Sequence, residues 1–111
     1  MNQQIKQAWI DALISGVYEQ GESCLRDGDK FCCLGVLCDL AEQDGFDNWK
    51  DGYFSGRDGV LSEAVLQWAG LPLNVNVSVP FYSKGGKRSL SGINDSGASF
   101  EEIAELIHDH L

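Results

Sequence analysis

The chain has 111 residues, of which 43% are hydrophobic, and this length and composition suit one globular domain with an ordinary core. Its 17 acidic and 8 basic residues give a net charge of −9, which repels phosphate backbones and argues against generic DNA or RNA binding. No apolar run is long enough to cross a bilayer, and the first residues lack the features of a secretory signal. We therefore expect a cytoplasmic protein that forms a single domain over 1–111 and does not contact a membrane.

Two helices are predicted in the first half of the chain. Apolar residues recur at helical spacing near 3–15 and near 33–43, and a glycine follows each stretch. Trp9 lies on the apolar face of the first helix, so we expect a core anchor there. Gly35 lies inside the second helix, where glycine lowers helix stability, and we expect another backbone to approach closely at this point.

A tight hairpin is predicted between these two helices. The dipeptide Asp27-Gly28 tolerates the positive φ angles of a type I′ turn and separates two short segments, near 22–26 and 29–32. A two-residue loop at this dipeptide would place Arg26 opposite Asp29, as a surface ion pair.

The second half alternates loops with regular elements. The stretch Asp44–Gly59 is rich in Asp and Gly and reads as a long, loosely structured connection. A third helix is predicted near 62–69, a strand near 74–81 from its strict alternation of apolar residues, and a last helix near 99–110 that begins with a capping box. Asn94–Gly97 is expected to be a turn. The whole pattern predicts an α+β fold, with about four helices packed with a small, mainly antiparallel sheet.

The four cysteines are interpreted as reduced, buried thiols. Cys32 and Cys33 are adjacent and lie in an apolar run, which suits neither a zinc knuckle nor a reactive thiolate. Zinc held by these cysteines and an enzyme assembled across the fold are the less favoured readings. We expect no metal, no cofactor and no catalytic residue.

Two surface segments are candidates for function. The Asp44–Gly59 stretch could contact a protein, since it carries aromatic anchors within a charged rim, namely Trp49, Tyr53, Phe54, Asp47 and Asp51. The alternative is a cradle for a small anion in the loop at 84–88, because glycine N–H groups in this loop lie beside three cations. Its residues would be Lys84, Gly85, Gly86, Lys87 and Arg88, with Asn94 and Asp95 close by to read a ribose or a base.

The sequence also resembles a family of small uncharacterised proteins encoded by tailed bacteriophages and prophages. The similarity rests on the run FCCLGVLCD at 31–39, on WIDAL at 9–13 and on the segment INDSG at 93–97 followed by Phe100. It covers most of the chain except the acidic middle and the strand with its basic loop. The resemblance implies phage origin and no particular chemistry.

These observations favour a function based on binding. We expect a phage-type accessory protein that binds a host protein in the cytoplasm of the bacterial host, for example as an inhibitor of a defence component, because an acidic surface captures basic partners quickly. The alternative is a binder or sponge for a nucleotide-type anion, and the third reading is an enzyme.

Overall fold

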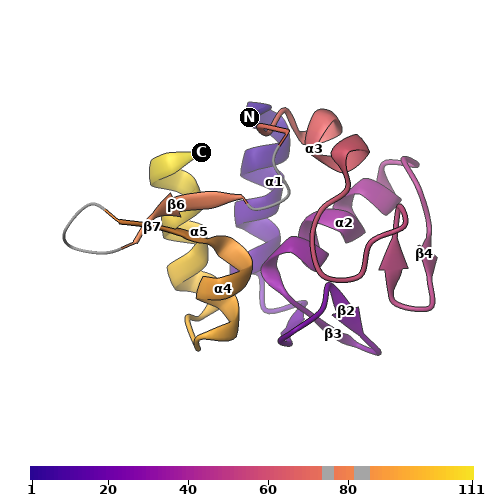
Figure 1. Ribbon diagram of the computed structural model, residues 1–111, viewed down its shortest axis with the longest axis horizontal. Helices are drawn as coiled ribbons and strands as arrows, with labels where there is room; N and C mark the ends of the chain where they lie inside the picture. Colours follow the sequence, from indigo (N-terminus) through magenta and orange to yellow (C-terminus); the bar gives the residue numbers. More distant parts are fainter. Residues whose placement is uncertain (74–76, 82–85) are drawn as a thin grey trace.

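The computed structural model describes residues 1–73, 77–81 and 86–111. Within these residues the chain forms helices separated by short strands, so the predicted α+β class is confirmed (Figure 1). The helices are α1 (Gln3–Ile14), α2 (Cys33–Gln43), α3 (Glu63–Ala69), α4 (Leu90–Asp95) and α5 (Phe100–His110). The strands are β1 (Glu19–Gln20), β2 (Arg26–Asp27), β3 (Lys30–Phe31), β4 (Trp49–Lys50), β5 (Tyr53–Phe54), β6 (Ser78–Pro80) and β7 (Lys87–Ser89).

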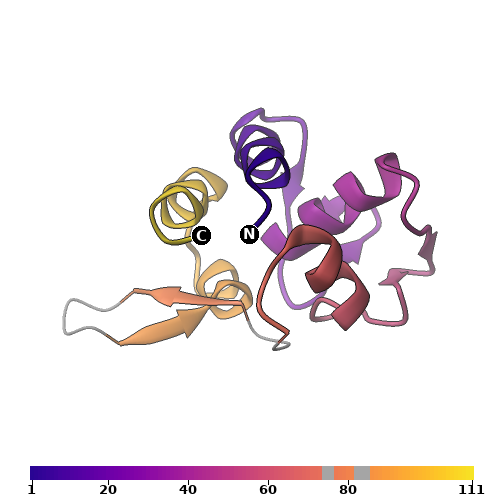
Figure 2. The ribbon, with the colours of Figure 1, turned by 90° about the horizontal axis from the view of Figure 1, so that it is seen from above.

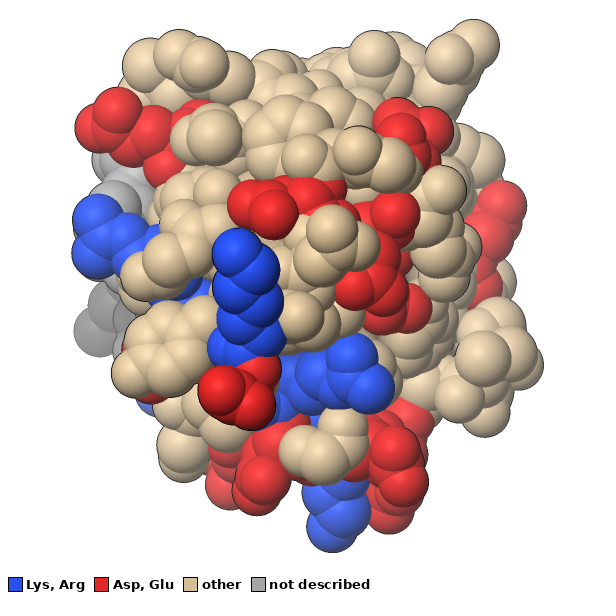
Figure 3. Space-filling model, turned by 90° about the vertical axis from the view of Figure 1, so that its right-hand side faces the viewer, with Lys and Arg blue, Asp and Glu red and all other residues tan. Residues whose placement is uncertain are grey.

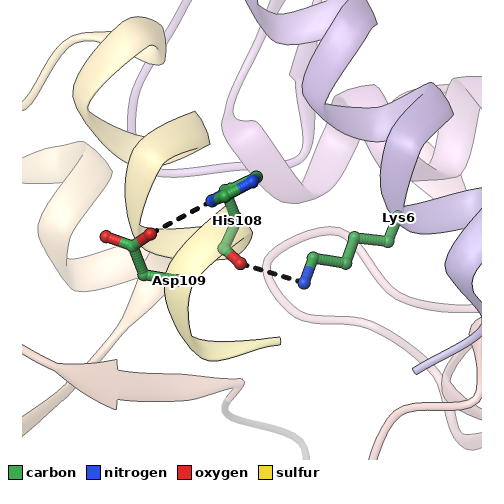
Figure 4. A network of polar contacts seen from close by, with 3 residues as sticks. All are labelled: Lys6, His108 and Asp109. Atoms are coloured by element: carbon green, nitrogen blue, oxygen red, sulfur yellow. Dashed lines mark hydrogen bonds and ion pairs between the residues drawn. The ribbon is translucent and has the colours of Figure 1, made fainter.

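The first and last helices lie side by side, although they are far apart in the sequence (Figure 2). The N-cap of α1 is Asn2, whose side chain accepts a hydrogen bond from the Ile5 amide. Lys6 on α1 donates to the main-chain carbonyl of His108 at 3.0 Å, near the carboxyl end of α5, where a cation is favoured by the helix dipole (Figure 4). The side chain of His108 points to Asp109 on its own helix, so the link between the helices is made by Lys6.

The core lies where α1, α2, α4 and α5 meet. Trp9 is fully buried, as predicted, and its indole Nε1 donates to the Cys33 carbonyl at 2.9 Å. Other large residues with no exposed surface come from α2, α4 and α5: Leu37, Leu90, Ile93, Ile103 and Ile107. The capping box of Ser99 and Glu102 that begins α5 is present.

A mixed three-stranded sheet precedes α2, with β3 in the middle, parallel to β1 and antiparallel to β2. The predicted hairpin exists, but its predicted register is wrong. The loop residues are Gly28 and Asp29, so Arg26 lies opposite Phe31 and not opposite Asp29. Gly28 takes the positive φ that its side-chain-free backbone allows, and Asp29, placed in the loop, forms no pair across the ladder.

The glycine inside α2 has the role expected for it. A Cβ on Gly35 would overlap the main-chain carbonyl of Leu25, which lies just before β2. The same carbonyl accepts a hydrogen bond from the Cys32 amide at 3.1 Å. The three-stranded sheet can therefore sit directly on the first turn of α2 only because residue 35 has no side chain.

The stretch 44–59 is ordered by two consecutive tight turns, which corrects the expectation of a loosely structured connection. Asp51 and Gly52 both have positive φ, 51° and 82°, and join β4 to β5 as a type I′ turn does. Ser55 and Gly56 repeat the pattern, with φ of 53° and 83°, and bring Phe54 opposite Arg57. The strand β5, Tyr53–Phe54, is half of this hairpin and pairs with β4.

The hairpin of β6 and β7 and the short helix α4 follow α3. The strand predicted near 74–81 is confirmed at Ser78–Pro80, with Pro80 as its last residue, while 74–76 lie outside the described residues. The expected turn at Asn94–Gly97 is wrong for its first half, because Asn94 belongs to α4, which was not predicted. The helix begins at the N-cap Ser89 directly after β7.

Candidate protein-binding surface

The rings of the β4–β5 hairpin belong mainly to a row of aromatic contacts that covers one side of the core. Tyr18 packs edge-on against Phe31 at 5.1 Å between ring centroids, Phe31 against Trp49 at 6.0 Å, and Trp49 against Phe54 at 5.1 Å. Phe54 has no exposed surface and is a core residue, which corrects its assignment as a partner contact. Trp49 is partly buried, and Tyr53 is 47% exposed.

A single carboxylate on α2 holds this row in place. Asp39 accepts hydrogen bonds from the Tyr18 hydroxyl at 2.6 Å, from Trp49 Nε1 at 3.1 Å and from Gln43 Nε2 at 3.3 Å. Burial, and then the hydrogen bond and the charge of Asp39, raise the pKa of Tyr18 to about 12. Trp49 is therefore oriented from inside the protein, and only one part of its indole is open to a partner.

A groove lies between α1, α2 and α3. It has a volume of about 320 Å³, and its walls are formed by Gln4, Ile5, Ala8, Leu40, Gln43, Asp44 and Trp68. Trp68 donates from Nε1 to Asp44 at 3.3 Å and packs against Phe46, which is 38% exposed. The lining is mostly apolar and aromatic, with a carboxylate at the edge and no Lys or Arg.

The groove leaves part of the apolar surface of three helices uncovered. Ile5, Leu40 and Trp68 pack against the core but keep part of their surface open. Sequence periodicity did not distinguish these residues from fully buried ones, because each sits on an apolar face and only the angle between the helices leaves it uncovered. The one local signal in the sequence is an aromatic residue, Phe46, placed just after the glycine that ends the predicted second helix.

The charged side chains on the hairpin side are of both signs. Between Asp39 and Asp58 the chain has six acidic and two basic residues. Figure 3 shows that acidic side chains on this face surround a smaller number of basic ones. Asp44 and Asp51 are exposed and Asp47 is partly exposed, so the predicted acidic residues are available at the surface.

The alternative anion cradle is only partly within the described structure. Lys84 and Gly85 lie outside the described residues, whereas Gly86 and Lys87 precede or begin β7. Arg88 lies with its guanidinium 5.9 Å from the centre of the Phe81 ring. The cradle itself remains a prediction.

Asn94 and Asp95, which were expected to read a ribose or base, are used inside the protein. Asn94 is 1% exposed, accepts from Gln20 Nε2 at 2.9 Å and from the Cys33 amide at 3.2 Å, and donates to the Gly21 carbonyl at 2.9 Å. Asp95 accepts from the Ser23 amide at 3.1 Å. The Asn94 side chain is therefore a structural element that ties α4 to β1 and to the start of α2.

The cysteines have the properties of buried apolar residues. All four are free, and Cys32, Cys33 and Cys38 are at most 3% exposed. Burial raises the pKa of Cys33 and of Cys38, and raises that of Cys32 to about 11. Cys24 is partly exposed, but burial and then the charges of Asp27 and Asp58 raise its pKa as well. Each thiol is thus kept protonated, which is the opposite of what a nucleophile needs.

Within the described ranges, no group of three or more His, Cys, Asp and Glu side chains is placed to hold a metal ion. In the same part of the chain no helix has the length and apolar character that a bilayer span requires.

Comparison with curated proteins and with solved structures gives no match in either. One protein-family model matches, and it covers residues 1–111. The chain therefore belongs to the family described as a domain of unknown function, DUF8296.

Proposed function

We propose that the protein acts by binding another protein, without catalysis, through the surface formed by the helix groove and the β4–β5 hairpin. The observation that carries the proposal is the groove, an open hollow of about 320 Å³ walled by Ile5, Leu40 and Trp68 with Asp44 at its edge. Open apolar and aromatic surface within a charged rim is the usual composition of the centre of a protein interface.

The two parts of this surface are joined through the carboxyl-terminal half of α2. Gln43 lines the groove and also donates to Tyr18 and Asp39, which position the hairpin ring Trp49. Glu42 accepts from the Trp49 amide at 3.0 Å. The groove and the hairpin are thus attached to one rigid helix, and this limits the conformational entropy lost when a partner binds.

The charges at the groove and over the whole protein indicate the chemistry of the partner. The groove has a carboxylate at its edge and no basic side chain in its walls, and the protein has a net charge of −9. A partner that offers an apolar side chain flanked by Lys or Arg would complement both features. The raised pKa values of all four thiols support a role without nucleophilic catalysis.

The identity of the partner as a host protein rests on the resemblance to phage and prophage proteins. In this proposal the chain is a phage-type accessory protein that works in the cytoplasm of the bacterial host, for example by inhibiting a defence component. The alternative, a binder of nucleotide-type anions at 84–88, is kept as an outcome of the test.

The test is affinity capture from host lysate with the wild type and three matched variants. Asp44→Lys reverses a charge at the groove, and Glu105→Lys makes the same change at an exposed position on α5. Ala8→Gln narrows the groove from an exposed position on α1 without touching a buried residue. We expect capture by the wild type and by Glu105→Lys, and its loss in both groove variants.

Two outcomes would contradict the proposal. If the three variants capture a partner equally well, the groove is not the binding surface. If no protein is captured and nucleotides raise the melting temperature of the purified protein, the small-ligand reading replaces it, because a tight ligand stabilises the folded state by mass action.

A further inference from the structure

Arg26 on β2 is held in one orientation by two aromatic rings. Its guanidinium carbon lies 4.9 Å from the centre of the Phe31 ring and 5.4 Å from that of Trp49. Its Nε donates to the Gly28 carbonyl at 2.9 Å, within the same hairpin. The rings are themselves fixed, since Phe31 is 8% exposed and Trp49 donates to Asp39.

Among residues 1–73, 77–81 and 86–111, the outer part of this guanidinium has no hydrogen-bond or ion-pair partner. In these ranges the Arg26 side chain makes one hydrogen bond, from Nε, and the ion pairs are Lys30 with Glu19 and His108 with Asp109. An arginine without an ion pair among the described residues is unusual in a chain with 17 acidic residues. The N–H groups of Nη1 and Nη2 therefore remain available as donors.

These donors lie at a hollow between the two tight hairpins. The hollow has a volume of about 360 Å³ and is lined by Arg26, Gly28, Trp49, Asp51 and Gly52. The positive φ angles of Asp51 and Gly52 leave their amides at the outside of the turn, and neither amide has a backbone partner in the part of the chain that the structure describes. A Cβ on Gly52 would come within 3.2 Å of the Arg26 carbonyl, so glycine lets the two hairpins approach this closely.

We propose that this hollow is a binding site for a carboxylate group, with Arg26 as its anchor. The planar fork of a guanidinium matches the two oxygens of a carboxylate, and its orientation is already set by the rings. The carboxylate of Asp51 lies at the same hollow, and its charge disfavours a phosphate dianion more than a monoanion. We therefore expect the site to take a small monoanion, and a carboxylate matches the planar fork of Arg26.

This site does not depend on the proposed protein-binding function. Its test uses small anions and no partner, so the two proposals can fail separately. A carboxylate from a small molecule and one from a protein side chain share the same chemistry, and the probes are chosen to separate them.

The experiment is a nuclear magnetic resonance titration of the ¹⁵N-labelled protein with sodium acetate, N-acetylglutamate methylamide, sodium phosphate and sodium chloride. We expect saturable shifts of the Arg26 Nε–H, the Trp49 Nε1–H and the Gly52 amide with acetate, with a dissociation constant in roughly the millimolar range. Similar or tighter binding of the glutamate derivative indicates a protein side chain as the natural ligand, and weaker binding indicates a small molecule.

The matched variants are Arg26→Lys and Arg57→Lys. Arg57 is an exposed arginine just after β5, so the substitution is the same but lies outside the hollow. We expect Arg26→Lys to weaken acetate binding at least about fivefold, because lysine keeps the charge and loses the fork. Arg57→Lys should leave it unchanged.

If Arg26→Lys does not fold, the titration of the wild type still tests the proposal. Shifts that rise linearly and equally with acetate and with chloride would overturn it. So would tighter binding of phosphate than of acetate, or an equal loss of acetate binding in both variants.

Discussion

The two ends of α2 differ in burial: the amino-terminal end lies in the core, whereas the carboxyl-terminal end is partly open. At the amino-terminal end, Gly35 admits the Leu25 carbonyl, Trp9 bonds to the Cys33 carbonyl and Asn94 bonds to the Cys33 amide. At the carboxyl-terminal end, Leu40, Gln43 and Asp44 line an open groove. One helix therefore serves as the centre of the core at one end and as a scaffold for exposed side chains at the other, and substitutions at the two ends should have different consequences.

The largest loss of stability is expected for Gly35→Ala at the buried end. The new methyl group would overlap main-chain atoms of Leu25, which cannot move without displacing the three-stranded sheet. We expect a loss of about 3 kcal/mol or more in the free energy of unfolding, measured by urea denaturation. Gly59→Ala is the control, because nothing lies within 4 Å of a Cβ there. Equal effects of the two substitutions would contradict the close approach.

Asn94→Ala should have the next largest effect. It would leave the Cys33 amide and the Gly21 carbonyl without their partner in a region that is 1% exposed at residue 94. We expect a loss of about 2–3 kcal/mol, the typical effect of unsatisfied buried polar groups. Asn48→Ala, at an exposed asparagine, should change stability by less than about 0.5 kcal/mol. If Asn94→Ala leaves the free energy of unfolding unchanged, water replaces the amide side chain.

Substitutions of the two hairpin rings near the open end of α2, Trp49 and Tyr53, should change the free energy of unfolding by different amounts. Trp49→Ala removes contacts with Phe31 and Phe54 and the hydrogen bond to Asp39, and we expect a loss of about 2 kcal/mol. Tyr53→Ala should cost less than about 0.5 kcal/mol, because this ring is 47% exposed. Loss of partner capture by Tyr53→Ala at unchanged stability would then report binding alone, which Trp49→Ala cannot do.

Tyr18→Phe should have a smaller effect than Trp49→Ala, and a pH-dependent one. It removes the hydrogen bond to Asp39, and we expect a loss of about 1 kcal/mol near neutral pH. The pKa of Tyr18 is raised to about 12 in the folded protein, above its ordinary value of 10, so its contribution is complete below pH 10 and is lost as the pH rises to about 12. Unfolding curves of the wild type and the variant should converge over this range. Parallel curves would contradict the raised pKa.

The sequence predicted the long elements well and the short ones poorly. The helices α1, α2, α3 and α5 begin and end close to where periodicity and caps placed them, because these signals act over neighbouring residues. The six-residue α4 offers too few turns for a periodic pattern, and it is fixed by bonds from Asn94 to Gln20 and Cys33, more than sixty residues away. Such bonds have no local signature in a sequence.

Two of the four Asp-Gly dipeptides, Asp27-Gly28 and Asp51-Gly52, show the limit of turn chemistry. Both occur in two-residue hairpins, yet Asp51-Gly52 forms the loop itself, whereas in the other hairpin the loop is Gly28-Asp29. At 51–52 the same dipeptide is a correct turn signal, and it predicts β4 and β5 on either side. The candidate site was predictable only in its exposed acidic residues and Tyr53, because the burial of Phe54 and the opening of the groove depend on how distant elements pack.

The packing of α1 against α5 has a consequence for how the chain reaches its native state. Helix α1 finds its main partner only in residues 100–110, and Lys6 is linked to a carbonyl 102 positions further along the chain. Closing so long a loop costs conformational entropy before the contact returns any stability. We expect folding to await synthesis of α5, with earlier segments unable to complete the core, and to be slower than for a helical protein of similar size with local contacts.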